Sequence, residues 1–174
     1  IDDVVDLSSL EIGKMQFLFA NNNAVAICRN VVDTVEKIKQ TSASVLFQTS
    51  LENLEIYTDE ARLQQLLINL LINATKFTTE GSITLSLEKQ SEEVALFAVS
   101  DTGCGIAPEK QGAIFNRFEK LNENAQGSGL GLSICQLIVE RFGGKIWIDP
   151  EYKNGSRFLF THPIVSTSRK EVSE

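Results

Sequence analysis

Two short glycine-rich stretches of the chain carry residue types that could bind a nucleotide. The first is DTGCGI at residues 101–106, where Asp101 follows a strongly apolar run. A carboxylate at the end of a strand, facing a pocket floored by glycine, can accept a hydrogen bond from an exocyclic amine such as that of adenine. Gly103 and Gly105 would let the backbone turn sharply and let a flat ligand approach closely. The alternative interpretation is an ordinary Asp-Gly turn.

The second stretch, GSGLGLSI at residues 127–134, brings three glycines to the start of a predicted helix. Backbone N–H groups at a helix N-terminus, together with the helix dipole, bind phosphate. The stretch is not a P-loop, because it lacks the Gly-Lys-Ser/Thr ending, and it does not match the dinucleotide-binding fingerprint, whose last glycine falls one residue later. It therefore predicts either a phosphate-binding turn or a flexible hinge.

A segment that could cover a bound nucleotide lies between the two glycine stretches. Phe115 and Phe118 are followed by the polar run EKLNENAQ at residues 119–126. Two aromatic anchors followed by a polar segment indicate a lid that folds over a ligand. We expect residues 121–128 to be mobile in the absence of nucleotide.

The strongest predicted helix, at residues 59–77, has a polar edge beside its apolar face. On a helical wheel Asn69, Asn73 and Lys76 fall within about 60° of one another, next to a stripe of leucines. The amide oxygen of Asn73 could ligate Mg²⁺, which takes one or two protein oxygens together with phosphate oxygens and water, while Lys76 could face phosphate. The alternative is that the two asparagines hydrogen-bond to neighbouring backbone.

The other predicted elements must position these residues. Thr58 or Asp59 can cap the strongest helix. Hydrophobic periodicity predicts helices at residues 23–43, 59–77, 108–118 and 129–144. Apolar or alternating runs predict strands at residues 15–20, 44–51, 55–58, 81–90, 93–101, 145–150 and 157–164. The last two strands are expected to form a hairpin, and the whole order favours an α/β sandwich with a mixed sheet on one side.

The composition describes one compact domain with its own core: 174 residues, 43% of them hydrophobic, with a net charge of -7. An acidic surface repels nucleic acid, so we expect no nucleic-acid partner. Cys28, Cys104 and Cys135 are far apart and odd in number, which favours reduced thiols and a cytoplasmic compartment. No apolar run is long enough to cross a bilayer.

Four motifs resemble, in order, the N, G1, F and G2 boxes of the sensor histidine kinases: NLLINATKFT, DTGCGI, IFNRFEKL and GSGLGLSI. The wider group, the GHKL superfamily, includes gyrase-type topoisomerases, mismatch-repair ATPases and a heat-shock chaperone family. The resemblance covers residues 59–164. It implies an α+β fold, a two-layer α/β sandwich of the Bergerat type, with a mixed, mostly antiparallel sheet packed against about three helices.

The resemblance also implies a site for ATP and Mg²⁺, in which Asn69, Asn73 and Lys76 are catalytic and Asn73 is the metal ligand. Hydrolysing relatives generally carry a glutamate at the place of Asn69 to activate water. An asparagine cannot act as a general base, which favours transfer of the γ-phosphoryl group to another acceptor. The residues implied to bind ATP are Asn73, Lys76, Asp101, Gly103, Gly105, Ile106, Phe118, Lys120, Gly127, Ser128, Gly129, Leu130 and Gly131.

By the same resemblance the chain would be the catalytic domain of a two-component sensor histidine kinase. It would donate the γ-phosphoryl group to a histidine on a separate helical domain. The only histidine, His162, is predicted to be structural or merely exposed, so the acceptor is expected outside this chain. A non-catalytic nucleotide-binding module and an ATP-hydrolysing relative are the alternatives.

The resemblance divides the chain into three parts. Residues 1–14 resemble the end of the dimerisation and phosphoacceptor helix, 15–165 the catalytic ATP-binding domain, and 166–174 a polar tail or linker. The implied partners are the histidine-bearing dimerisation domain of the same parent and the receiver domain of a response regulator. The parent would be a homodimer that could be membrane-anchored, while this segment by itself could be a monomer.

Overall fold

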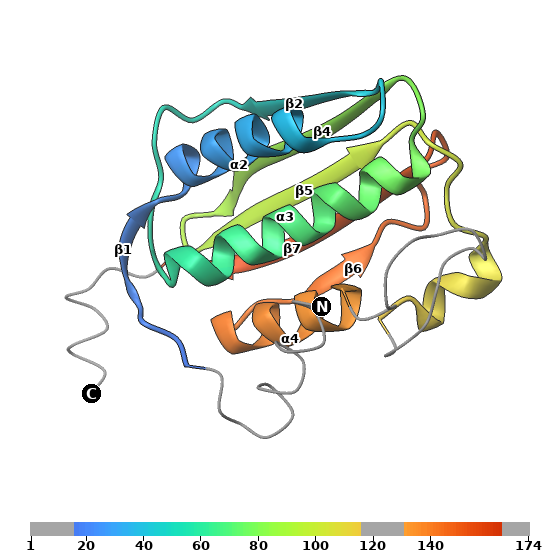
Figure 1. The fold of residues 1–174 in the computed structure, drawn as a ribbon. Coiled ribbons are helices and arrows are strands. Elements are labelled where there is room, and N and C mark those ends of the chain that lie inside the picture. The colour runs from blue at the N-terminus through green and yellow to red at the C-terminus, as the bar shows by residue number, and fades with distance from the viewer. Residues whose placement is uncertain (1–15, 116–130, 165–174) are drawn as a thin grey trace.

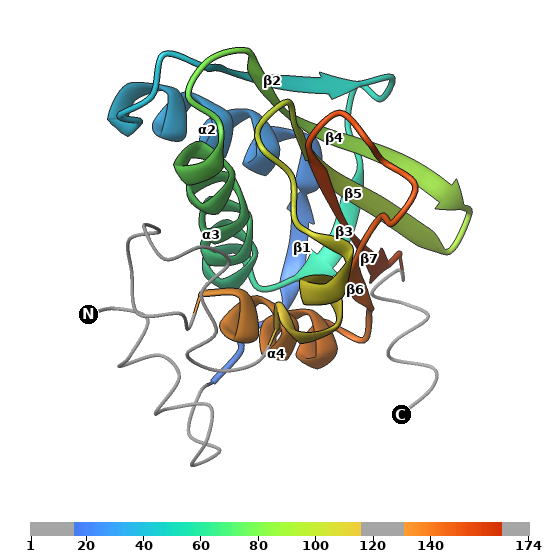
Figure 2. The same cartoon turned by 90° about the vertical axis from the view of Figure 1, so that its right-hand side faces the viewer.

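A computed structural model describes residues 16–115 and 131–164 of the chain. They form two layers, a five-stranded sheet and three α-helices on one of its faces (Figures 1 and 2). β2 runs parallel to β4, and all other neighbouring strands are antiparallel, which confirms the predicted sandwich with a mixed, mostly antiparallel sheet. The strand order is β2 (Ser44–Thr49), β4 (Ser82–Ser91), β5 (Val94–Asp101), β7 (Ser156–Pro163) and β6 (Ile146–Ile148).

The helices lie side by side, with α3 (Glu60–Phe77) between α2 (Ala24–Ile38) and α4 (Gly131–Phe142) (Figure 1). A separate antiparallel pair consists of β1 (Ala20–Asn23), which leads into α2, and β3 (Glu55–Thr58), which leads into α3. Among the described residues, no helix combines the length and apolarity needed to span a bilayer.

The core lies between the sheet and the helices, because the strands alternate between buried and less buried residues. Along β7 every second residue is buried. At the centre, Phe97 of β5 stacks on Phe160 of β7, with ring centroids 4.5 Å apart. The buried stripe of α3 matches the apolar face predicted for that helix: Leu63, Leu66, Leu67, Leu70, Leu71 and Ala74.

α3 begins after Asp59, which is one of the two capping residues that the sequence predicts. The Asp59 carboxylate accepts a hydrogen bond from the Arg62 backbone N–H at 2.9 Å, which satisfies a donor left free in the first turn. Its second oxygen accepts from the Leu18 backbone N–H at 2.7 Å. One buried carboxylate therefore fixes both the start of α3 and the segment before β1.

The strand predicted at residues 15–20 is wrong, because β1 begins only at the last of these residues. Phe17 and Phe19 instead pack edge-on against Phe142 at the end of α4, with ring centroids 5.7 and 6.1 Å from its ring. The pattern of these residues predicts a strand, but in the structure the rings of Phe17 and Phe19 pack against the end of α4.

The helix predicted at residues 108–118 corresponds to a short 3₁₀-helix, η1 (Pro108–Ala113), which begins at the proline as predicted. The predicted hairpin near the C-terminus is confirmed by the antiparallel pairing of β6 with β7. The predicted helix end at 1–14, lid at 121–128 and tail at 166–174 lie outside the described residues.

His162 is structural, as one of the two predicted alternatives had it. The side chain lies in β7 and is 1% exposed. Its Nδ1 donates to the Pro163 carbonyl oxygen at 2.8 Å, and its Nε2 accepts from the Thr58 hydroxyl at 2.9 Å. Burial lowers the pKa of His162 below 6.5, and the bond to Pro163 opposes this effect only in part. The neutral imidazole is therefore the favoured form in the fold.

Candidate functional site

Three segments meet at one end of the sheet: the end of α3, the turn after β5 and the loop before β7 (Figures 1 and 2). The backbone N–H of Cys104 donates to the Phe77 carbonyl oxygen at 3.2 Å, so the turn after β5 is bonded to the last residue of α3. On its other side the turn faces the loop before β7, where Gly105 lies against Gly155. Two of the predicted site elements, the polar-edged helix and the first glycine stretch, are thus adjacent.

Asp101 ends β5 with a carboxylate that is buried and fixed by hydrogen bonds. The residue is 2% exposed. Its Oδ1 accepts from the backbone N–H groups of Gly103 at 2.9 Å and Ser156 at 3.2 Å, and its Oδ2 accepts from the Ser156 hydroxyl at 3.0 Å. A carboxylate has about four lone-pair positions, so these three bonds leave Oδ2 with capacity for one further donor.

Ser156 is a site residue that the sequence analysis missed. It lies at the start of β7, directly opposite Asp101 in the antiparallel ladder, and is buried. The two residues are 55 positions apart, so only the pairing of the strands brings them together. The signal available in the sequence was a small hydroxyl residue after a glycine at the start of an apolar strand.

The glycines after Asp101 lie where a side chain has no room. A Cβ added to Gly103 would come within 2.2 Å of the Phe77 carbonyl oxygen. Gly105 has a φ of +76°, a left-handed conformation that favours glycine, and an added Cβ would lie 3.1 Å from the Gly155 carbonyl oxygen. The turn is therefore pressed against α3 on one side and against the loop before β7 on the other.

The polar edge of α3 lies beside the buried stripe, as its spacing predicts. Asn69 and Asn73 are half-buried, and Lys76, in the last turn, is exposed. The side-chain nitrogen of Asn69 is buried and has no hydrogen-bond partner in the described part of the chain. A buried donor without a partner is costly, so it marks a place where a ligand atom would be favourable.

The start of α4 lies toward the end of α3 that carries this polar edge. The Cys135 thiol is 3.9 Å from the Leu66 carbonyl oxygen, and the guanidinium groups of Arg62 and Arg141 both lie over the ring of Phe17. The two helices therefore run antiparallel, and the first residue of α4, Gly131, is displaced from Leu66 toward the end of α3 that carries the polar edge.

Most of the chain, from Thr58 onward, matches one known protein family. Residues 58–166 match the family described as histidine kinase-, DNA gyrase B-, and HSP90-like ATPase. The chain belongs to this ATPase family. The matched range includes the polar edge of α3, the Asp101 turn and Ser156.

This ATPase domain is also similar to a sensory kinase. It is 30% identical over 168 residues to the adaptive-response sensory kinase SasA of Rippkaea orientalis, covering 94% of this chain and 43% of the relative. The chain thus spans less than half the length of that relative. The match identifies the chain as a histidine kinase ATPase domain.

Two solved structures share the fold of this ATPase domain. Full-length ShkA in complex with AMPPNP superposes with a TM-score of 0.84 at 28% identity, covering 95% of this chain and 35% of that one. Histidine kinase ThkA in complex with the response regulator protein TrrA superposes with a TM-score of 0.75 at 30% identity, covering 93% of this chain and 47% of that one. The first of these neighbours and the family together support ATP binding by this domain.

Two further residues that the sequence analysis singled out in this ATPase domain lie within the described part. Phe115, the first predicted lid anchor, packs edge-on against Phe158 of β7, with ring centroids 6.1 Å apart. Ile106 is partly buried and packs against the core. Six predicted site residues lie outside the described part: Phe118, Lys120, Gly127, Ser128, Gly129 and Leu130.

Proposed function

We propose that this domain binds ATP together with Mg²⁺ and donates the γ-phosphoryl group to a histidine on a helical domain of its parent protein, from which a response regulator receives it. The observation that carries the proposal is the Asp101 carboxylate, buried and oriented by Gly103 and Ser156 with one acceptor position left over. The kinase relative, the AMPPNP complex of ShkA and the ThkA complex with TrrA support it.

The adenine end of the nucleotide would lie against the turn after β5. An exocyclic amine is a donor, and the remaining acceptor position of Asp101 suits it. Gly103 and Gly105 let this turn pack closely against α3 and against the loop before β7, and Ile106 would supply an apolar wall for the base. The Asp101 carboxylate is buried and held by three hydrogen bonds, so this end is pre-organised for its ligand.

The phosphate end would lie between the polar edge of α3 and the start of α4. The unpartnered Asn69 nitrogen is a donor suited to a phosphate oxygen, and the amide oxygen of Asn73 is a ligand suited to Mg²⁺. Lys76 and the N-terminal N–H groups of α4 would add positive potential. Bound there, Mg²⁺ would neutralise phosphate charge. The remaining predicted ATP-binding residues would complete this end: Phe118, Lys120, Gly127, Ser128, Gly129, Leu130 and Gly131.

The reaction that fits these residues is transfer and not hydrolysis. A bond forms between an imidazole nitrogen and the γ-phosphorus, the bond from the γ-phosphorus to the bridging oxygen breaks, and ADP leaves with the electrons of that bond. The side chain of Asn69 cannot take a proton from water. His162 is unsuited as the acceptor, because it is buried and both of its ring nitrogens are hydrogen-bonded.

The proposal is tested by mixing the chain with γ-labelled ATP, Mg²⁺ and the helical acceptor domain of its parent. We expect acid-labile label on the acceptor with the wild-type chain, and none with Asp101→Asn or Asn73→Asp. Nucleotide binding without transfer would favour a non-catalytic module, and release of free phosphate without labelled acceptor would favour a hydrolysing enzyme. Unchanged ATP titration in both variants would remove the assignment of the site.

A further inference from the structure

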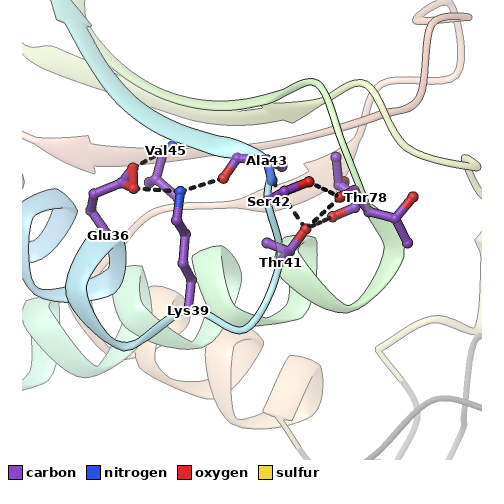
Figure 3. Close-up of polar contacts among 8 residues, drawn as sticks. Glu36, Lys39, Thr41, Ser42, Ala43, Val45 and Thr78 are labelled. Carbon is purple, nitrogen blue, oxygen red and sulfur yellow. Dashed lines mark hydrogen bonds and ion pairs between the residues drawn. The ribbon is translucent and has the colours of Figure 1, made fainter.

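The connection between α2 and β2, residues 39–43, is hydrogen-bonded to the chain just beyond α3 (Figure 3). The Thr41 hydroxyl is 2.5 Å from the Thr78 carbonyl oxygen and 3.0 Å from that of Thr79, and the Ser42 hydroxyl donates to the Thr79 oxygen at 2.8 Å. Two hydroxyl groups therefore hold backbone carbonyls that follow the last helical residue.

This connection is itself braced from α2 and from its own backbone. The Glu36 carboxylate accepts from the Val45 backbone N–H at 2.8 Å and is paired with Lys39. The Lys39 ammonium donates to the Ala43 carbonyl oxygen at 2.6 Å, and the Ala43 N–H donates to the Thr41 hydroxyl at 3.2 Å. Figure 3 shows these contacts as one continuous set that leads from α2 to Thr78.

The opposite side of the same short segment touches the proposed nucleotide site. The Phe77 carbonyl oxygen accepts from Cys104, and a Cβ on Gly103 would lie 2.7 Å from the Thr78 hydroxyl oxygen. Thr78 is 0% exposed, and its own hydroxyl has no partner in the described part of the chain. The side chain of Thr78 therefore makes no hydrogen bond that holds this segment. The Thr41 hydroxyl holds it instead, through the backbone carbonyl oxygen of Thr78.

We propose that Thr41 is a positioning residue for nucleotide binding. Its hydroxyl holds the Phe77–Thr79 segment against the turn that carries Asp101 and Gly103, and so fixes the last turn of α3 without touching the ligand. The inference rests on the proposed function, because the effect is read as nucleotide affinity. Thr41 lies 37 positions from Thr78 in the sequence, so a distant segment of the chain helps to shape the proposed site.

Thr49 offers a matched control within the same strand region. Its hydroxyl donates to the Leu87 carbonyl oxygen at 2.5 Å and accepts from the backbone N–H two residues on, at 3.1 Å, as Thr41 does. Both threonines are half-buried. Thr49 lies at the far end of β2, away from Asp101, so its loss removes the same bonds without loosening the proposed site.

The experiment compares Thr41→Val with Thr49→Val in the whole chain, using calorimetric titration with AMPPNP and Mg²⁺ and hydrogen exchange of the Cys104 amide without nucleotide. Both variants should lose a similar amount of thermal stability. We expect Thr41→Val to weaken affinity roughly three- to tenfold and to speed Cys104 exchange, with Thr49→Val unchanged in both and Thr41→Ser restoring both.

Equal affinity and equal Cys104 exchange in the two valine variants would overturn the inference. If Thr41→Val does not fold, Ser42→Ala, which removes only the bond to Thr79, should show the same two effects in weaker form. Wild-type affinity and wild-type Cys104 exchange in Ser42→Ala would also overturn the inference. Failure of the wild-type chain to bind AMPPNP would instead contradict the proposed function, and the exchange of Cys104 would still decide the positioning role.

Discussion

Ser156 holds the Asp101 carboxylate with two hydrogen bonds, from its backbone N–H to Oδ1 at 3.2 Å and from its hydroxyl to Oδ2 at 3.0 Å. Both residues are buried, and both lie at strand ends that face each other across the β5–β7 ladder. The carboxylate therefore has one orientation before any ligand arrives. The bonds also decide which of its lone pairs remains open.

Ser156→Ala should weaken ATP binding about three- to tenfold, because it frees Oδ2 from its fixed direction and leaves a buried carboxylate with one bond fewer. Ser100→Ala is the matched control, since the Ser100 hydroxyl accepts from Arg157 on the neighbouring pair of the same ladder. Titration calorimetry of both variants measures the effect. Equal losses of ATP affinity in the two variants would mean that the bond from the Ser156 hydroxyl to Asp101 only stabilises the strand pair.

Asn73→Ala should remove most of the gain in ATP affinity that Mg²⁺ supplies. The reason is that an alanine offers no oxygen ligand, so the ion would be held by phosphate and water only. Titrations with Mg²⁺ and with a chelator give the gain for each variant, and Asn30→Ala, an exposed asparagine on α2, serves as the control. A gain of wild-type size in Asn73→Ala would exclude this residue as the metal ligand.

Phe17→Ala should lower the free energy of unfolding by about 2 kcal/mol, less than a fully buried ring because Phe17 is half-exposed. The ring contacts Phe142 and lies beneath two guanidinium groups, with Arg141 at 4.6 Å and Arg62 at 5.8 Å. Leu18→Ala should leave stability nearly unchanged, because Leu18 is 83% exposed. Denaturant unfolding of the two variants measures both effects. Equal losses in the free energy of unfolding would contradict the packing of Phe17 against Phe142.

His162 should make the domain less stable in mild acid. Burial lowers its pKa below 6.5, so the unfolded chain binds the proton more readily than the folded one. Its contribution is fully present above about pH 6.5 and falls as the pH drops toward the folded pKa, by at most about 1.4 kcal/mol per pH unit. Denaturant unfolding between about pH 7.5 and 5.5 should show a steeper loss in wild type than in His162→Gln. Parallel curves would contradict this assignment.

The sequence predicted the local parts of the fold well, because they depend on neighbouring residues. The apolar stripe and polar edge of α3 follow from helical spacing, and its start follows from the capping side chain of Asp59. The hairpin of β6 and β7 is likewise a local feature. The strand expected at residues 15–20 was wrong because a run of apolar and aromatic residues does not reveal that Phe17 packs against a helix end.

The site was predicted only in part, because some of the hydrogen bonds that hold it come from segments distant in the sequence. Asp101, Gly103 and Gly105 were found from their spacing after an apolar run and from the order of the four motifs. Their assignment to a ligand remains a prediction. Ser156 was missed because strand pairing alone places it beside Asp101. Thr41 was missed for the same reason, since nothing in its own neighbourhood indicates a bond to Thr78.

The most direct test of the account is a titration of the chain with ATP and, separately, with inosine triphosphate, both with Mg²⁺. Hypoxanthine carries a carbonyl oxygen where adenine carries its amino group, so it would set an acceptor against the open acceptor position of Asp101. We predict that ATP binds and that inosine triphosphate binds at least about a hundredfold more weakly. Equal affinity for the two nucleotides, or no binding of ATP, would contradict the account.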